Sequence, residues 1–142
     1  MNDLKESNIK RAIKVLREGD IKRTREGDIK RTVEDYLQFG MNQGKWYFDR
    51  LNSGSLIICN PDGSFRRKVR LCREGTADFI VIRKWWPPGA PNKWETLVIF
   101  LELKSAKGKL GKEQRCFKTL VEAQGALNVV IKSIEDLKEV LE

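Results

Sequence analysis

The sequence predicts a mixed α/β domain with one central sheet flanked by helices. Apolar residues near both ends of the chain recur at helical spacing, as in Ile9, Ile13 and Leu16. The middle of the chain instead carries short apolar runs of strand length, several with an alternating pattern. The expected order is helix, three or four strands, helix, strand, helix. A chain of 142 residues is long enough for one domain with its own core.

The charge of the chain is strongly basic, because 28 Lys and Arg stand against 20 Asp and Glu, a formal net charge of +8. A balance of that size favours a polyanionic partner, nucleic acid first and an anionic membrane second. The chain has no apolar run near the roughly 20 residues that span a bilayer, and from its polar N-terminus we expect no secretory signal. We therefore expect a cytoplasmic protein. Its cysteines should be reduced thiols that fill the core: Cys59, Cys72 and Cys116.

Histidine is absent from the whole sequence. This excludes histidine-based catalytic triads, histidine general bases and histidine metal ligands. Any hydrolytic chemistry must then use carboxylates, lysines and a hard metal ion.

Residues 1–32 are expected to form a helical, basic extension in which Ser7 can cap a first helix. Within it, Arg17–Thr24 recurs unchanged as Arg25–Thr32. An eight-residue unit is too short for a solenoid repeat. We interpret the duplication as a basic linker, mobile or helical, with a nucleic-acid-contacting arm as the alternative. The main domain, residues 33–142, would begin with a helix capped by Thr32.

Strands are expected through the middle of this domain. They are predicted at residues 46–51, 56–59, 65–71, 77–82 and 96–104. Asn60–Gly63 should form a tight turn, and a stiff, aromatic, proline-rich connection should join the last two strands as antiparallel neighbours. The predicted end of the chain is a helix at 112–123, a strand at 127–131, and a helix opened by a Ser133 capping box. The first of these helices should place Cys116, Leu120 and Ala123 on one face, with Phe117 and Val121 beside them.

The strand at 96–104 is apolar on both faces until it reaches Glu102, as expected for a strand covered on both sides. Lys104 shares the face of Glu102. In an antiparallel pair, Asp78 at the start of the preceding strand would lie beside Glu102, and two carboxylates that close require a cation between them. Mg²⁺ binds through such carboxylates, water and substrate phosphate, with the Leu103 carbonyl as a further candidate ligand. It would activate a bound water for attack on phosphorus, which Lys104 could orient.

These residues and their neighbours resemble the VRR-NUC family, the virus-type replication-repair nucleases of the PD-(D/E)XK superfamily. A Glu-x-Lys element alone is common by chance, whereas the whole ordered set is much more specific. In order, the matching segments are Gly75-Thr76-Ala77-Asp78, Glu102-Leu103-Lys104-Ser105, Gly108-Lys109-Leu110 and Gln114. The resemblance covers the chain from about Glu34 to the C-terminus.

The resemblance implies a restriction-endonuclease-like core of order αβββαβ and a Mg²⁺- or Mn²⁺-dependent DNA endonuclease. It implies a metal held by Asp78 and Glu102, a catalytic Lys104, an active-site Gln114 and a helix-borne acid at Glu34, itself a tentative metal ligand. It also implies a phage- or virus-encoded homodimer that cuts branched DNA such as flaps or four-way (Holliday) junctions.

Several points stay open at this stage. Because the segment before Glu34 is duplicated, the position of the helix-borne acid is ambiguous, and Glu26 or Glu18 could take the place of Glu34. The alternatives to a DNA endonuclease are a non-catalytic DNA-binding module and a Glu-x-Lys enzyme acting on nucleotides or RNA. Nucleic-acid contacts are expected from basic residues, and from two tryptophans that could instead be core or interface aromatics. These residues are Arg66, Arg67, Lys68, Lys107, Lys109, Lys112, Trp85 and Trp86.

Overall fold

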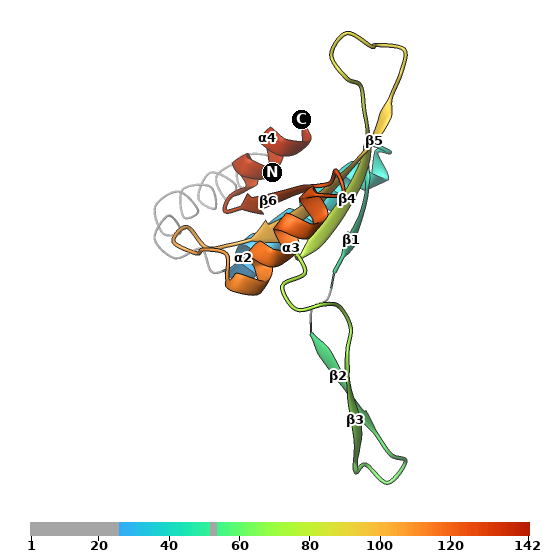
Figure 1. Ribbon diagram of the computed structural model, residues 1–142, viewed down its shortest axis with the longest axis vertical. Coiled ribbons are helices and arrows are strands. Elements are labelled where there is room, and N and C mark those ends of the chain that lie inside the picture. The colour runs from blue at the N-terminus through green and yellow to red at the C-terminus, as the bar shows by residue number, and fades with distance from the viewer. Residues whose placement is uncertain (1–25, 52–53) are drawn as a thin grey trace, which may run out of the picture.

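The computed structural model describes residues 26–51 and 54–142 (Figure 1). The helix predicted to start at Ser7 and the first copy of the repeat lie outside the described residues. The described chain is a mixed α/β structure with three helices, a four-stranded mixed sheet and a separate two-stranded hairpin, which confirms the predicted class. The elements are α2 (Glu26–Asn42), β1 (Tyr47–Arg50), β2 (Ser55–Cys59), β3 (Phe65–Arg70), β4 (Phe79–Trp85), β5 (Glu95–Leu103), α3 (Lys112–Glu122), β6 (Leu127–Ile131) and α4 (Ile134–Leu141).

The four-stranded sheet has the order β1-β4-β5-β6. β4 lies antiparallel to β1 and to β5, with Phe79 opposite Leu101, so the predicted antiparallel pairing of these two strands is confirmed. β6 pairs parallel with β5 and places Ile131 opposite Leu103. The parallel pairing follows from the crossover through α3, because parallel neighbours cannot be joined by a tight turn.

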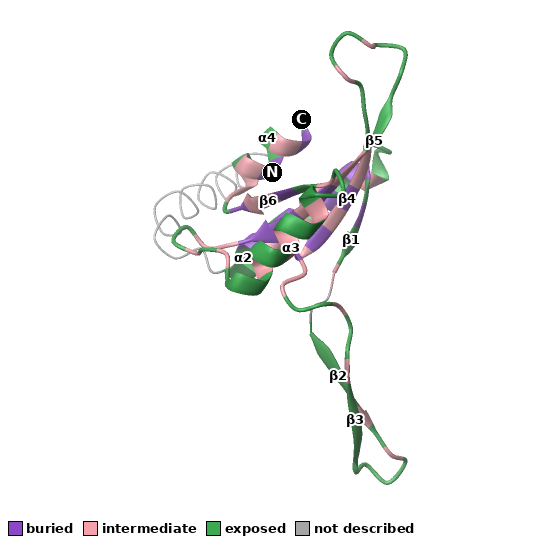
Figure 2. Cartoon of the chain, in the orientation of Figure 1, coloured by how far each residue is buried: buried purple, intermediate pink, exposed green. Residues whose placement is uncertain are grey.

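The core lies mainly on one face of this sheet. In β5, Ile99, Leu101 and Leu103 are fully buried and belong to one apolar cluster with residues of α2 and α4. On the opposite face, Phe100 packs edge to face on Phe117 of α3, with 5.1 Å between the ring centroids. Figure 2 shows the resulting purple band of buried residues along the centre of the sheet. β5 is therefore covered on both sides at its C-terminal half, as its apolar sequence predicts.

The helix α2 begins at Glu26 and not at Val33, so the predicted helix start is wrong. Ile29, Val33 and Leu37 recur every four residues and are all buried, which carries the helix back through the second copy of the repeat. Thr32 lies inside the helix, where its hydroxyl donates to the Asp28 carbonyl at 3.2 Å instead of capping the helix. The boundary expected between residues 32 and 33 therefore falls within α2.

The helix α3 is turned differently from the prediction. Phe117 faces the sheet, whereas Cys116 and Leu120 are exposed. Cys59 is also exposed and Cys72 is half-buried, so the expectation that the cysteines fill the core is wrong. The physical reason is that these apolar residues lie on a helix face and a hairpin that no other described element covers.

The hairpin β2–β3 stands apart from the sheet and projects from the body of the protein (Figure 1). The predicted turn is present, with Gly63 at φ 85°, a left-handed conformation that glycine adopts without strain. β3 was expected to be half-buried, but neither face of the ribbon is covered, and Ile57 and Phe65 are each 65% exposed. The hairpin therefore has no core of its own.

The last helix, α4, begins as the sequence predicts. The Asp136 N–H donates to Ser133 Oγ at 3.2 Å, and Asp136 Oδ2 accepts from the Ser133 N–H at 3.1 Å, which is a reciprocal capping box. Of the helices in the described part of the chain, none is long and apolar enough to cross a membrane.

Candidate active site

Asp78 is positioned by its backbone at the end of the sheet where β4 begins and β5 ends. Its N–H donates to the Leu101 carbonyl at 3.0 Å, and its own carbonyl accepts from the Leu51 N–H at 2.8 Å. The bond from Leu51 continues the register of β1 with β4 by one residue, whereas the Asp78 N–H bonds to the carbonyl of Leu101, one residue short of the register of β4 with β5. Asp78 lies close enough to Glu102 for its negative charge to act on the Glu102 carboxyl. The structure thus brings together the two acids that the sequence analysis paired.

The carboxylate of Asp78 is held by two donors. Its Oδ2 accepts from the Leu103 N–H at 2.9 Å, and its Oδ1 accepts from Lys30 Nζ, also at 2.9 Å. Lys30 comes from α2, where it follows the buried Ile29. The sequence analysis did not single out Lys30, and the burial of Ile29 was the signal that could have placed its neighbour against the sheet.

Glu102 is buried, with 4% of its surface exposed. Its Oε1 lies 3.0 Å from Lys104 Nζ, so the predicted Glu-x-Lys pair forms an ion pair at the end of β5. The same oxygen accepts a hydrogen bond from Gln114 Nε2. Gln114 Oε1 in turn accepts from the Gly111 N–H at 2.8 Å, which ties the first turn of α3 to the site.

Burial raises the pKa of Glu102 above its ordinary value. The negative charges of Asp78 and Glu26 raise this pKa further, whereas the hydrogen bond and the positive charge of Lys104 lower it. The net direction is upward because one ammonium does not replace the water that Glu102 has lost. A second positive charge near its oxygens would stabilise the ionised form.

Two glutamates of α2, Glu26 and Glu34, lie at different distances from Glu102. Glu26, in the first turn, is the one whose charge acts on Glu102. Glu34 lies about 12 Å further along the helix axis, and its carboxylate is 3.9 Å from Arg50 NH1 at a partly exposed position. Glu26, which the sequence analysis kept as an alternative, therefore belongs to the group around Glu102, and Glu34 lies outside it.

The oxygen atoms at this site are those that a hard cation prefers: the carboxylates of Asp78 and Glu102 and the carbonyl of Leu103. In the described part of the chain, no three Asp, Glu, Cys or His side chains lie together as a ready-made metal site. Mg²⁺ does not need such a set, because it commonly retains several waters and takes only one or two carboxylates. The donor chemistry and the raised pKa of Glu102 therefore fit Mg²⁺ or Mn²⁺.

The segment before Asp78 approaches α3 closely at Gly75. A Cβ at this position would lie 2.3 Å from the Glu113 carbonyl, and the φ of 82° also favours glycine. A contact this close joins the start of β4 to the first turn of α3, from which Gln114 reaches Glu102.

The expected nucleic-acid contacts fall into three places. Lys107, Lys109 and Lys112 are exposed between β5 and the start of α3, next to Glu102 and Lys104. The three basic residues of β3 lie on the projecting hairpin: Arg66, Arg67 and Lys68.

Trp85 ends β4, and Trp86 follows it. Seven and eight residues of extended chain separate these tryptophans from Asp78, a span of about 23–26 Å. They therefore do not contribute to the acid cluster.

Comparison with protein-family models, curated proteins and solved structures finds no match to this chain.

Proposed function

We propose that this protein is a metal-dependent nuclease that hydrolyses phosphodiester bonds in DNA, with Asp78, Glu102 and Lys104 at the reacting phosphate. The observation that carries the proposal is the meeting of two carboxylates and a lysine where β4 begins and β5 ends, next to the buried apolar part of both strands. A buried acid such as Glu102 is unfavourable unless a partner compensates it. The net charge of +8 supports a polyanionic substrate.

The resemblance to the VRR-NUC family supports the same proposal. Setting the hairpin β2–β3 aside leaves the order α2, β1, β4, β5, α3, β6, α4, of which the first six elements follow the αβββαβ order expected of a PD-(D/E)XK core. We extend the proposal on this basis to branched DNA and to a homodimer. Two active sites in one dimer would allow both strands of a four-way junction to be cut.

In this mechanism Asp78, Glu102 and the Leu103 carbonyl hold the cation. A bound Mg²⁺ or Mn²⁺ supplies the means to lower the pKa of a water and to offset charge on a phosphoryl oxygen. The Leu103 N–H fixes the Asp78 carboxylate, and Gln114 orients the Glu102 carboxylate.

Lys104 contributes a positive charge at the phosphate. Its Nζ is held 3.0 Å from Glu102 Oε1, and its side chain is only 13% exposed, so the ammonium is pre-positioned. A fixed ammonium stabilises negative charge that develops on the phosphoryl oxygens, and it can orient the attacking water. Glu26 then takes the role of the helix-borne acid.

The basic residues around the site would bind the DNA backbone. Lys107, Lys109 and Lys112 would contact phosphates next to the cut, and the β2–β3 hairpin would add more distant phosphate contacts. Contacts of this type position the substrate without reading its sequence and make affinity strongly dependent on salt.

The direct test is cleavage of linear and branched DNA in the presence of Mg²⁺. We expect Glu102→Gln to reduce the rate roughly a thousand-fold, because metal ligation supplies several kcal/mol of charge stabilisation. Glu34→Gln is the matched control, since it removes a carboxylate of the same type outside the cluster. Equal activity of wild-type and Glu102→Gln protein would refute this site assignment.

A second candidate is a non-catalytic DNA-binding module. One observation favours it: each acid already has a lysine partner, Lys30 for Asp78 and Lys104 for Glu102, so the charges are compensated by the protein alone. This alternative predicts tight, salt-sensitive binding with no turnover under any divalent metal. Competition between DNA and RNA in the same assays would separate a ribonuclease from both.

A further inference from the structure

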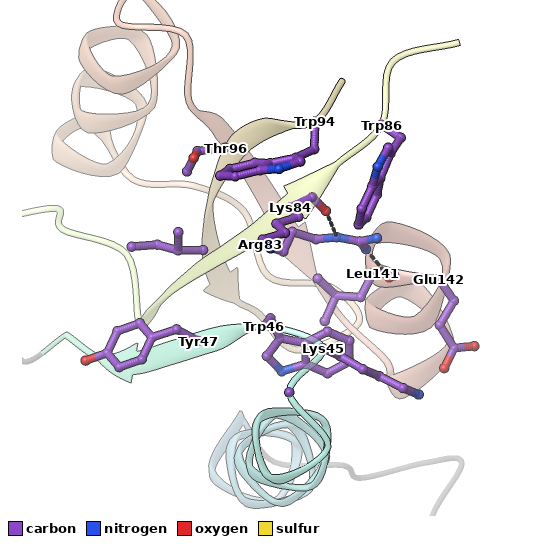
Figure 3. A pocket seen from close by; sticks show the side chains of 12 residues that line it. Lys45, Trp46, Tyr47, Arg83, Lys84, Trp86, Trp94, Thr96, Leu141 and Glu142 are labelled. Atoms are coloured by element: carbon purple, nitrogen blue, oxygen red, sulfur yellow. Dashed lines mark hydrogen bonds between the residues drawn. The ribbon is translucent and has the colours of Figure 1, made fainter. Parts of the chain in front are cut away.

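A second candidate site lies at the opposite end of the β4–β5 ladder. A cavity of about 760 Å³ opens there, between the starts of β1 and β5 and the ends of β4 and α4 (Figure 3). This volume lies within the range of about 300–1,000 Å³ that is typical of small-molecule pockets. The proposed nuclease chemistry does not use any residue of this cavity.

The cavity exposes large aromatic side chains to water. Trp86 is 51%, Trp94 50% and Tyr47 52% exposed, and all three line the cavity. Figure 3 shows the indole rings of Trp94 and Trp86 on either side of the Lys84–Arg83 stretch. Aromatic surface left exposed in a cluster commonly marks a binding site.

The arrangement of the sheet explains why these rings are exposed. Lys84 pairs with Thr96 and Tyr47 pairs with Ile82, and alternation along the strands places Tyr47, Lys84 and Thr96 on the same face as Phe100. Trp94 directly precedes β5, and its ring lies against Lys84. α3 covers this face at Phe100 through Phe117. At the other end of the same face, the aromatic rings remain half-exposed.

Three cations accompany the aromatic rings: Lys45, Arg83 and Lys84. The Lys84 ammonium lies 4.7 Å from the centroid of the Trp94 ring, so a positive charge and a flat apolar surface are presented together. Arg83 is held by a hydrogen bond from its guanidinium to the Leu141 carbonyl.

Glu142 is the only acid among the described residues that line the cavity, and it accepts a hydrogen bond from the Tyr36 hydroxyl. Burial, followed by this hydrogen bond and the charge of Glu142, raises the pKa of Tyr36 to about 12. Tyr36 therefore remains a donor near neutral pH. With Glu142 engaged in this way, the cavity favours a ligand that combines a flat ring with negative charge.

We propose that this cavity binds single-stranded DNA, with an unpaired base stacked on Trp94 and Trp86 and the adjacent phosphates held by Lys45 and Lys84. Base–aromatic stacking on a basic surface is the usual means of holding a single strand without reading its sequence. The identity of the polyanion as DNA rests on the proposed function. An apolar peptide would explain the rings and leave the three cations unexplained.

The cavity and the acid cluster are far enough apart to act on different parts of one substrate. Asp78 and Lys84 are separated by six residues of extended chain, a distance of about 20 Å. This corresponds to the rise of roughly six nucleotides in a duplex. A branched substrate cut at Glu102 would then present its unpaired strand at Trp94.

The test measures binding in EDTA, so that cleavage does not contribute. Fluorescence anisotropy would compare a labelled oligothymidylate with an abasic oligonucleotide of the same length and charge. We expect Trp94→Ala to weaken oligothymidylate binding roughly 5- to 150-fold, the range that follows from the usual stacking contribution. Binding of the abasic strand should change little, and Trp94→Phe should retain most of the affinity.

Two further variants serve as controls. Phe39→Ala removes an exposed aromatic ring of α2 that is not among the described residues lining the cavity, and it should leave both affinities unchanged. Lys84→Gln should weaken both oligonucleotides equally, because it removes a phosphate contact and leaves the rings. Unchanged thermal midpoints would show that each variant is folded. If Trp94→Ala does not fold, Trp94→Phe and Lys84→Gln still test the proposal.

The proposal is overturned if Trp94→Ala affects both oligonucleotides equally or neither of them. It is also overturned if the substitution turns a dimer into a monomer by light scattering without any base-dependent loss, since the cavity would then be a subunit interface. Competition by free thymidine monophosphate as strong as by the oligonucleotide would instead indicate a mononucleotide site and would contradict single-strand binding. Base-dependent binding without any cleavage would support single-strand binding in the cavity and reject the nuclease. Cleavage without base-dependent binding would support the nuclease and reject single-strand binding in the cavity.

Discussion

The two ends of the β4–β5 strand pair differ in what they expose to water. At one end the carboxylate of Glu102 is buried, whereas at the other end the indole rings of Trp86 and Trp94 are exposed. Both ends reverse the usual preference, which places charges outside and large aromatic groups inside. The difference lies in the helices. α2 and α3 supply partners at the acid end, through Lys30 and Gln114, whereas at the other end Trp86 and Trp94 stay about half exposed.

This contrast indicates two kinds of site on one sheet. Polar groups that are buried and mutually hydrogen-bonded are held in a fixed geometry, which suits chemistry at a defined atom. Aromatic rings that are exposed beside cations suit a ligand with many equivalent units, such as a single strand. Substitutions around Glu102 should therefore affect turnover, and substitutions around Trp94 should affect binding.

After the Glu102→Gln substitution described above, the largest effect is expected from Lys104→Met. The substitution removes the ammonium and keeps much of the length and apolar volume of the side chain. We expect turnover to fall roughly a hundred-fold or more, because a fixed charge that stabilises the transition state is commonly worth that much. The measurement is single-turnover cleavage of a branched DNA at saturating protein. An equal loss in the affinity for uncleaved DNA would instead make Lys104 a binding residue.

The next effect is the stabilisation of the folded protein by Mg²⁺. Metal at about one hundred times its dissociation constant should raise the free energy of unfolding by about 2.7 kcal/mol. Thermal unfolding should show this shift in wild-type and in Trp94→Ala protein, and it should be lost in Glu102→Gln. A shift that survives Glu102→Gln would place the cation elsewhere.

The same shift should depend on pH, because burial raises the pKa of Glu102. In metal-free protein a raised carboxyl pKa favours the folded state at low pH, and this contribution is lost as the pH rises through the folded-state pKa. The proton and the cation compete for the same carboxylate. The Mg²⁺-induced shift should therefore be largest at pH values above the raised pKa and shrink as the pH falls towards it.

The smallest effect compares two acids of one helix. Glu26→Gln should reduce cleavage roughly tenfold, as expected for a group that tunes a metal site from its surroundings. Glu34→Gln should change it less than about twofold, since surface substitutions away from a site have small effects. Both rates can be measured in one assay at one metal concentration. A larger loss of cleavage in Glu34→Gln than in Glu26→Gln would make Glu34 the helix-borne acid and contradict the role given to Glu26.

Local patterns were enough to predict the parts of the fold that depend on neighbours in the chain. The Ser133–Asp136 capping box and the Asn60–Gly63 turn form from residues within a few positions of one another. The proximity of Asp78 and Glu102 also followed from the sequence, because in an antiparallel pair the start of one strand lies beside the end of the other.

Residues that act across long separations could not be found in this way. Lys30 and Asp78 are 48 positions apart and meet only because α2 crosses the sheet at that point. The duplicated segment offered two equivalent lysines and two equivalent glutamates, and only packing selects between the copies. The sequence likewise suggested that Cys116 faces inward, because its spacing fits a helix face as well as that of Phe117 does.

The amino-acid sequence was sufficient to establish the mixed α/β class, the strand that carries Glu102 and Lys104, and the partnership of that strand with Asp78. These follow from hydrophobic periodicity and from short-range turn and capping chemistry. The tertiary structure was needed to place Lys30, Glu26 and Gln114 around the acids, to separate the β2–β3 hairpin from the sheet, and to leave Trp86 and Trp94 exposed. These depend on which helix covers which part of the sheet, and that is decided by packing between segments distant in the chain.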